Sequence, residues 1–247
     1  MSIITSLGLF YAPAILAGED SPSWSYGGAD NPTQWGRLGD DFAACELGRD
    51  QSPIDINIDE AIKSTPAKIE FNYSSVPLVV VNNGHTAQVN YQPGSSVKID
   101  GEEYELLQFH FHTPSEHTVS EKASAMELHL VHRNSKGELA VIGVMMEEGL
   151  ANPFIDKIWQ HIPLEPRVNE VEKMTFNAQD LLPKDISYVS YAGSLTTPPC
   201  SEGVKWHVLT EAIEVSPTQI ANFQKLYQVN ARPIQPLNGR TIKLRQQ

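Results

Sequence analysis

The sequence predicts a mostly β fold with peripheral helices (α+β class), and three observations support this prediction. Short segments rich in Val, Ile, Phe and Tyr recur between turn residues along the chain. Helical periodicity occurs in only a few places. The 17 prolines and 16 glycines are spread through all 247 residues, without a stretch long enough to serve as a linker. We therefore expect a single domain built on a large, mainly antiparallel sheet.

Seven segments have the composition of strands, because β-branched and aromatic residues dominate them and turn residues bound them. These segments are residues 77–81, 86–91, 103–112, 126–133, 139–146, 187–192 and 204–209. Most are short and follow one another closely, which favours antiparallel pairing of neighbours.

Two helices are expected at the edge of the sheet. The first covers residues 152–162, in which Phe154, Ile155, Ile158, Trp159 and Ile162 share one face. The second follows Ser216, whose hydroxyl can cap the helix, with Pro217 at the first position and Gln219 completing a capping box. Three side chains of this second helix would face the core: Ile220, Phe223 and Tyr227.

The charge of the chain disfavours polyanionic partners. The sequence contains 18 Lys and Arg against 30 Asp and Glu, a net charge of −12, and has no run of basic residues. Such a chain has nothing to neutralise a nucleic-acid backbone or an anionic membrane surface. We therefore expect neither nucleic acid nor membrane as a partner. With 40% hydrophobic and 19% charged residues, the composition is that of a globular domain.

Residues 1–18 have the character of a secretory signal peptide. They carry no charged side chain, and an apolar stretch over residues 7–16 precedes small residues near Ala17, where cleavage is expected. The usual Lys or Arg near the start is missing, and Pro13 interrupts the stretch. A disordered or trimmed tail is the alternative, and a membrane anchor is disfavoured because the segment is too short and too polar.

The chain has two cysteines, Cys45 and Cys200. They are too few for a disulfide scaffold and too far apart in sequence for a Cys-x-x-Cys clip. From the residues alone, they are either two buried thiols or one long-range bridge.

Five of the eight histidines lie between residues 110 and 132. In a strand, His110 and His112 share a face, while the phenylalanines between and before them point the other way. The same alternation places Glu127, His129 and Val131 on one face of the next expected strand. If the two strands pair, His129 completes a three-histidine site.

Three neutral imidazoles with an open fourth position suit a catalytic zinc ion. Gln108 and Glu127 each precede a histidine of the site by two residues on the same face, where they could accept the spare ring N–H and fix the tautomer. An exposed or hydrogen-bonded pair is the alternative for His-x-His alone. The third histidine and the two polar partners favour a metal site.

These motifs occur within a sequence that resembles an alpha-class carbonic anhydrase of the bacterial, secreted type, from about Trp24 to Lys243. The matching stretches are WSYG (24–27), QSPIDI (51–56), NNGH (82–85), QFHFH (108–112), SEHTV (115–119), ELHLVH (127–132), GSLTTPP (193–199) and RPIQP (232–236). The resemblance implies a domain over residues 19–247 with a twisted sheet of about ten strands. It also implies zinc at the base of a conical cavity and reversible hydration of carbon dioxide to bicarbonate and a proton.

The resemblance also assigns roles to single residues. His110, His112 and His129 would bind Zn²⁺, and zinc hydroxide would attack carbon dioxide. Thr196 would accept a hydrogen bond from the hydroxide and donate one to Glu116, which orients the nucleophile. From the pattern alone, Thr196 would be a turn hydroxyl and Glu116 a surface acid.

His85 matches the residue that carries the proton from the site to buffer, a task that suits an imidazole. Without the resemblance it would be an exposed turn histidine. Tyr26 and Asn83 match polar residues that hold water on the proton's route. The other histidines are assigned no catalytic role: His117 and His132 are expected to make structural hydrogen bonds, and His161 and His207 to lie on the surface or in the sheet.

A hydrophobic wall is expected beside the zinc, because carbon dioxide is apolar. By the resemblance it consists of Val131, Val141, Leu195, Val204 and Trp206, with Thr197 next to the bicarbonate position. Without the resemblance, the five apolar residues would simply be core.

Both cysteines match the disulfide of secreted and bacterial members of the family. The resemblance therefore implies a Cys45–Cys200 bridge, which would close a loop of more than 150 residues and brace the segment that presents Thr196. Chain entropy would put its stabilisation at about 4–5 kcal/mol. A disulfide favours an oxidising compartment, so a periplasmic or secreted location is expected.

Two alternatives to an enzyme stay open. One is a non-catalytic member of the same fold that has lost a ligand histidine, and the other is a zinc-binding or buffering protein. All three ligands are present together with His85, Glu116 and Thr196, which favours the enzyme over a non-catalytic member of the fold. Only a measurement of activity separates the enzyme from a zinc-binding or buffering protein. A homodimer is an open alternative to a monomer, because the sequence does not give the oligomeric state.

Overall fold

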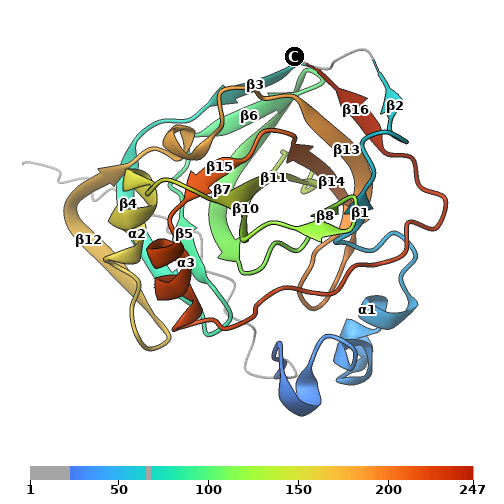
Figure 1. The fold of residues 1–247 in the computed structure, drawn as a ribbon, viewed down its shortest axis with the longest axis horizontal. Helices are drawn as coiled ribbons and strands as arrows, with labels where there is room; N and C mark the ends of the chain where they lie inside the picture. Colours follow the sequence, from blue (N-terminus) through green and yellow to red (C-terminus); the bar gives the residue numbers. More distant parts are fainter. Residues whose placement is uncertain (1–22, 65–67, 247) are drawn as a thin grey trace, which may run out of the picture.

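The computed structural model describes residues 23–64 and 68–246. The expected signal peptide, residues 1–18, lies outside the described residues. Within them, thirteen strands form one twisted sheet, and short helices lie outside it (Figure 1). A second, three-stranded sheet lies beside it.

The thirteen strands of the large sheet are β2 (Ile62–Lys63), β3 (Ile69–Asn72), β4 (Val76–Asn82), β5 (Ala87–Asn90), β6 (Ser96–Ile99), β7 (Glu102–His112), β10 (Met126–Arg133), β11 (Leu139–Glu148), β12 (Arg167–Phe176), β13 (Tyr188–Ser194), β14 (Glu202–Leu209), β15 (Ile213–Val215) and β16 (Lys243–Arg245). Their main path is β12-β4-β5-β7-β10-β11-β14-β13-β16-β2. The small sheet contains β1 (Asp55–Ile56), β8 (Thr118–Val119) and β9 (Lys122–Ala123).

The prediction of a mainly antiparallel sheet is confirmed. Each of the seven expected segments forms a strand, and their neighbours pair antiparallel except where β11 meets β14 and β15 and where β16 meets β2. Nine strands in the described residues were not expected, namely β1, β2, β3, β6, β8, β9, β12, β15 and β16, and β12 is the longest of them. It is an edge strand that pairs with β4 alone, most of its residues are exposed or half-buried, and its register shifts between Glu170 and Thr175. An edge strand needs no regular apolar alternation, which explains why the sequence pattern did not reveal it.

The helices are short. In the described ranges, three are α-helical, namely α1 (Ala44–Leu47), α2 (Pro153–Trp159) and α3 (Pro217–Gln224), and four are 3-10 helices, namely η1 (Gly28–Asp30), η2 (Trp35–Arg37), η3 (Asp40–Phe42) and η4 (Ala178–Leu181). α2 is shorter than expected, and the side chain of Asn152 caps it. The capping box predicted at the start of α3 is confirmed, with the Ser216 side chain bonded to the N–H of Gln219 and the Gln219 side chain bonded back to Ser216. Ile220, Phe223 and Tyr227 are buried, as predicted.

The sheet separates two apolar layers. On one side, which we call the apolar face, Phe109 and Phe111 of β7 pack with Leu128 and Leu130 of β10 in the larger core. On the other side, which we call the histidine face, a smaller cluster is centred on Trp206. No helix within the described ranges is long and apolar enough to cross a membrane.

Candidate metal centre

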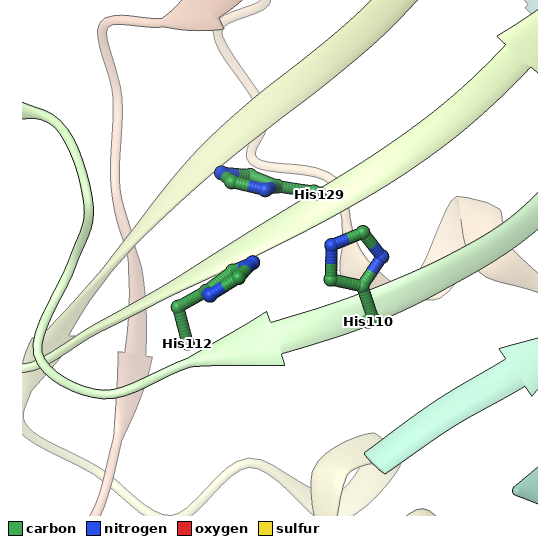
Figure 2. A group of neighbouring side chains, drawn as sticks. All are labelled: His110, His112 and His129. Atoms are coloured by element: carbon green, nitrogen blue, oxygen red, sulfur yellow. The ribbon is translucent and has the colours of Figure 1, made fainter. Parts of the chain in front are cut away.

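Pairing of β7 with β10 brings three histidines together. The two strands are antiparallel, with His129 opposite His110 and Glu127 opposite His112. Figure 2 shows the three imidazoles gathered on the same side of the two strands. The ring centroid of His112 lies 5.0 Å from that of His110 and 4.5 Å from that of His129. Nitrogen atoms of all three rings lie within 4.8 Å of one another. The strand pairing that the sequence argument required is therefore present.

The two polar side chains singled out from the sequence each contact a histidine of the site. Gln108 Oε1 lies 2.8 Å from Nδ1 of His110, and Glu127 Oε1 lies 2.9 Å from Nε2 of His129. Each contact occupies one ring nitrogen as a donor. The nitrogens left to bind a cation are therefore Nε2 of His110 and Nδ1 of His129.

The third histidine has a partner that sequence reasoning missed. Nδ1 of His112 lies 2.7 Å from the backbone carbonyl oxygen of Asn230. The side chain of Asn230 also accepts a hydrogen bond from the N–H of Thr113 and donates to the carbonyl oxygen of Phe111, so it ties this loop to the end of β7. A backbone carbonyl leaves no mark in the residue type. The sequence indicated only that the second ring nitrogen of His112 needs a hydrogen-bond acceptor, and it did not indicate which group supplies it.

Burial keeps these histidines neutral. It lowers the pKa of His110 well below the ordinary value and lowers the pKa of His112 to about 4. The pKa of His129 is also lowered, mainly by burial, although the charge of Glu127 opposes the shift. A neutral imidazole keeps a free lone pair for a metal, whereas a protonated one does not.

Glu127 links the site to a buried hydrogen-bond chain. Its Oε1 also lies 2.7 Å from Nδ1 of His117, and Nε2 of His117 lies 2.6 Å from the hydroxyl of Tyr191. Burial alone would raise the pKa of Glu127, but its interactions with His117 and His129 hold it well below the ordinary value. His117, Glu127 and His129 also lie close enough to surround an ion. Their facing atoms are already joined by hydrogen bonds, however, and His117 has the structural role expected of it.

Glu116 is a buried acid, not a surface one. It is 2% exposed, and its Oε1 accepts a hydrogen bond of 2.8 Å from the backbone N–H of Arg232. Burial raises its pKa to about 7, although His129, the Arg232 N–H and the Thr196 side chain each lower it. Thr196 is also buried, at 5% exposed, whereas Oε2 of Glu116 has no hydrogen-bond partner among the described residues.

The segment that carries Thr196 is braced from three directions. Ser194 exchanges hydrogen bonds with Ser52 through its hydroxyl (2.9 Å) and its N–H (3.1 Å). Cys200 forms a disulfide with Cys45, which confirms that prediction and excludes two free thiols. The side chain of Gln51 donates to the carbonyl oxygen of Cys200.

His85 lies apart from the three-histidine cluster. It is half-buried and stacks on Trp24, with the ring centroids 3.7 Å apart. Burial lowers its pKa from the ordinary value. The side-chain oxygen of Asn83 accepts hydrogen bonds from the N–H groups of His85 and Thr86, so that oxygen holds the turn before β5. Tyr26 packs against Trp24, and burial together with the charge of Glu116 raises its pKa well above the ordinary value.

The residues expected to form the hydrophobic wall share the histidine face. Val131, Val141, Val204 and Trp206 belong to one buried cluster, and Leu195 packs against it. The indole of Trp206 lies 4.8 Å from the ring of His129, centroid to centroid, and its N–H donates to the carbonyl oxygen of Ser194. Thr197 is half-buried, and its carbonyl oxygen accepts a hydrogen bond from the N–H of Cys200.

The donor set fits zinc. Nε2 of His112 is buried and, among the described residues, has no hydrogen-bond partner. Leaving a ring nitrogen unsatisfied in the interior is costly, so a cation at this point would compensate for it. Three neutral imidazole nitrogens with an open position are the ligands of a catalytic zinc site.

Comparisons with known proteins agree with this geometry. Residues 30–246 match the family of eukaryotic-type carbonic anhydrases. A carbonic anhydrase from Nostoc sp. is 46% identical over 224 residues, which cover 89% of this chain and 85% of that protein. The alpha-carbonic anhydrase of Thermovibrio ammonificans, solved with the inhibitor sulfanilamide, has a TM-score of 0.88 at 42% identity, covering 90% of this chain and 99% of that one.

A hyperthermostable carbonic anhydrase from a hydrothermal vent chimney matches similarly. Its TM-score is 0.87 at 47% identity, and the match covers 90% of this chain and all of that one. Alpha-carbonic anhydrases use zinc, which is the metal that the three-histidine site fits. The chain therefore belongs to the alpha-carbonic anhydrase family, whose activity is the zinc-dependent hydration of carbon dioxide.

Proposed function

We propose that His110, His112 and His129 hold the Zn²⁺ with which this chain converts carbon dioxide reversibly to bicarbonate and a proton. The observation that carries the proposal is the single free nitrogen on each neutral ring, with the other nitrogen occupied by Gln108 or Glu127 or by the Asn230 carbonyl. When bound, zinc supplies the Lewis acidity that lowers the pKa of water to about 7, a value known for carbonic anhydrases.

Thr196 and Glu116 would orient the nucleophile. An ionised Glu116 can only accept, so a hydroxyl beside it must donate its one proton to the carboxylate. The oxygen of Thr196 would then be left to accept a hydrogen bond from a nucleophilic oxygen beside the three histidines. Such a bond would hold that oxygen in a fixed orientation toward carbon dioxide.

The apolar cluster on the histidine face supplies the carbon dioxide site. Val131, Val141, Val204 and Trp206 are at most 9% exposed, and Leu195 packs against them. Such a wall offers carbon dioxide no hydrogen bonds, whereas bicarbonate is better solvated by water and by Thr197. This difference favours release of the charged product.

His85 passes the proton to buffer, and Tyr26 and Asn83 hold water on its route. The half-buried position of His85 supports this role, since the ring is accessible to solvent. We expect His85→Ala to slow turnover mainly at low buffer concentration, with rescue by added imidazole. His161→Ala, which removes a histidine outside the site, serves as the control. Unchanged turnover of His85→Ala at low buffer would remove this role from His85.

Stopped-flow measurement of carbon dioxide hydration on metal-analysed protein tests the proposed function. We expect one zinc per chain and hydration far above the buffer background. A full complement of zinc without hydration above that background would contradict the enzyme and leave a zinc-binding protein.

An extracytoplasmic location, periplasmic or secreted, is proposed for the mature chain, residues 19–247. The Cys45–Cys200 disulfide supports it, because such bridges persist in oxidising compartments. Mass spectrometry of the exported protein locates the cleavage site, and cleavage elsewhere than near Ala17 would correct the boundary. A homodimer stays a prediction, which light scattering of the purified protein tests.

A further inference from the structure

A hollow lies on the other side of the sheet from the histidines. It has a volume of about 470 Å³ and is lined by residues of β13, β14 and β16 together with the turn between β6 and β7. Its strands carry the histidine-face cluster on one side, with Val189, Trp206 and Leu244 among its members. Residues that alternate with these along each strand point to the opposite side of the sheet, which is the side of the apolar face, and the hollow opens there.

The register of the strands explains why a hollow forms. Ser190 of β13 lies between Lys243 of β16 and His207 of β14, and Ala192 lies beside Lys205. The short side chains of Ser190 and Ala192 on β13 therefore lie beside longer side chains on β14 and β16. Tyr104 of β7 borders the same space. Short residues ringed by long ones leave a depression in the surface.

Three cationic side chains line this depression in a chain whose net charge is −12. Lys205 is already engaged, 2.6 Å from the Tyr104 hydroxyl and 3.2 Å from Glu138. The Arg245 side chain is only 15% exposed, and its guanidinium lies 4.0 Å from the exposed carboxylate of Asp100. Lys243 is exposed and forms no ion pair with any residue in the described ranges. Lys243 therefore brings an unpaired positive charge to a hollow that Asp100 and Glu102 also line.

His207 marks the buried floor of the same hollow. It is 6% exposed, and its Nδ1 has no hydrogen-bond partner among the described residues. Burial, together with the charges of Arg245 and Lys205, lowers its pKa to about 4. The ring is therefore neutral near pH 7 and leaves the positive charge to the lysines and the arginine.

We propose that this hollow binds a small oxyanion, of the size of bicarbonate or inorganic phosphate. Lys243 and Arg245 supply the charge, and the hydroxyls of Ser190 and Thr241 supply hydrogen bonds to its oxygens. Asp100 and Glu102 at the rim disfavour large polyanions by repulsion. The site is separate from the zinc centre, because the sheet lies between them.

Titration of the zinc-loaded protein followed by amide NMR shifts tests the proposal. Phosphate and bicarbonate are added separately at constant ionic strength, with sodium chloride as the reference. We expect saturable shifts at Ser190, His207 and Lys243, with dissociation constants on the order of 1 mM. Saturation by phosphate alone would identify phosphate as the source, and saturation by both would identify small oxyanions in general.

Lys243→Gln provides the matching variant, because the side chain is exposed and its loss does not disturb the fold. We expect it to weaken binding about tenfold, as loss of a charge-assisted hydrogen bond implies. Lys225→Gln removes the same charge from an exposed position at the end of α3, outside the hollow, and should leave binding unchanged. Shifts that do not saturate, or equal binding by Lys243→Gln and the unmodified chain, would overturn the proposal.

Discussion

The two faces of strands β7 and β10 are built from the same stretch of chain and do opposite things. On the apolar face, Phe109, Phe111, Leu128 and Leu130 are fully buried and present no polar atoms. On the histidine face, each imidazole of the site has a polar partner for one nitrogen. Because successive side chains of a strand point to opposite faces, residues that stabilise the core and residues that form the metal site can be neighbours in sequence.

The two faces also differ in the kind of support they receive. The apolar face is held by side-chain packing within the sheet and against α2 and α3, where the ring of Phe111 contacts Trp159 and Phe223. The histidine face depends on residues far along the chain, such as Asn230 and Arg232, whose backbone groups contact His112 and Glu116. Substitutions of neighbouring residues on the two faces should therefore affect different properties.

The largest expected effect follows from His129→Ala on the histidine face. Removing one of three ligands should abolish zinc retention and reduce hydration to the buffer background, since metal affinity depends on the full ligand set. Metal analysis after dialysis and stopped-flow kinetics measure both. His161→Ala is the matched control, and full zinc content in His129→Ala would show that the site is assigned wrongly.

Leu130→Ala changes the adjacent residue on the apolar face. Leu130 is completely buried, so its truncation should lower the free energy of unfolding by about 2–5 kcal/mol. Urea unfolding measures this loss. The folded fraction should still bind one zinc per chain. If Leu130→Ala lost zinc while keeping its stability, the separation between the faces would be false.

Gln108→Leu tests a partner of a ligand instead of the ligand itself. His110 would lose the acceptor for its Nδ1 proton, and zinc affinity should fall about 10–100-fold. Competition with a chelator measures the affinity. At saturating zinc, most of the activity should return, which distinguishes this variant from His129→Ala. Gln160→Leu, at an exposed position, is the control, and an affinity equal to that of the control would deny Gln108 this role.

The smallest effect concerns pH and a histidine on the apolar side. Burial lowers the pKa of His132 to about 3, whereas an unfolded histidine titrates near 6.5. The unfolded chain therefore binds more protons below pH 6.5, so the free energy of unfolding falls as pH decreases from about 6.5 toward 3. The slope for one such histidine is at most about 1.4 kcal/mol per pH unit.

His132→Gln removes this contribution while keeping a polar partner for the Tyr73 hydroxyl. We expect urea unfolding between pH 7 and pH 4 to depend less on pH in the variant than in the unmodified chain. Above pH 7, the two should show the same dependence. Identical slopes below pH 6.5 would contradict a neutral, buried His132.

Local patterns predicted the parts of the site that lie on one strand. Alternation alone placed His110, His112 and Gln108 on one face, and it placed Glu127 beside His129. The strands rich in β-branched residues and the capping box of α3 were predictable for the same reason, since each depends on residues a few positions apart.

The rest depends on contacts that residue types do not record. The partner of His112 is a carbonyl oxygen of Asn230, 118 positions away, and Glu116 accepts from a backbone N–H of Arg232. Any residue carries such groups, so the sequence leaves them unmarked. β12 escaped prediction because an edge strand with exposed polar residues has little apolar alternation. The Cys45–Cys200 pairing could be expected only from resemblance to the family.

X-ray diffraction from crystals of the zinc-loaded protein, measured on both sides of the zinc absorption edge, tests the central claim most directly. One anomalous peak is expected between β7 and β10, at about 2.0–2.1 Å from Nε2 of His110, Nε2 of His112 and Nδ1 of His129. A peak among His117, Glu127 and His129, or no peak on the histidine face in active protein, would contradict the proposed site.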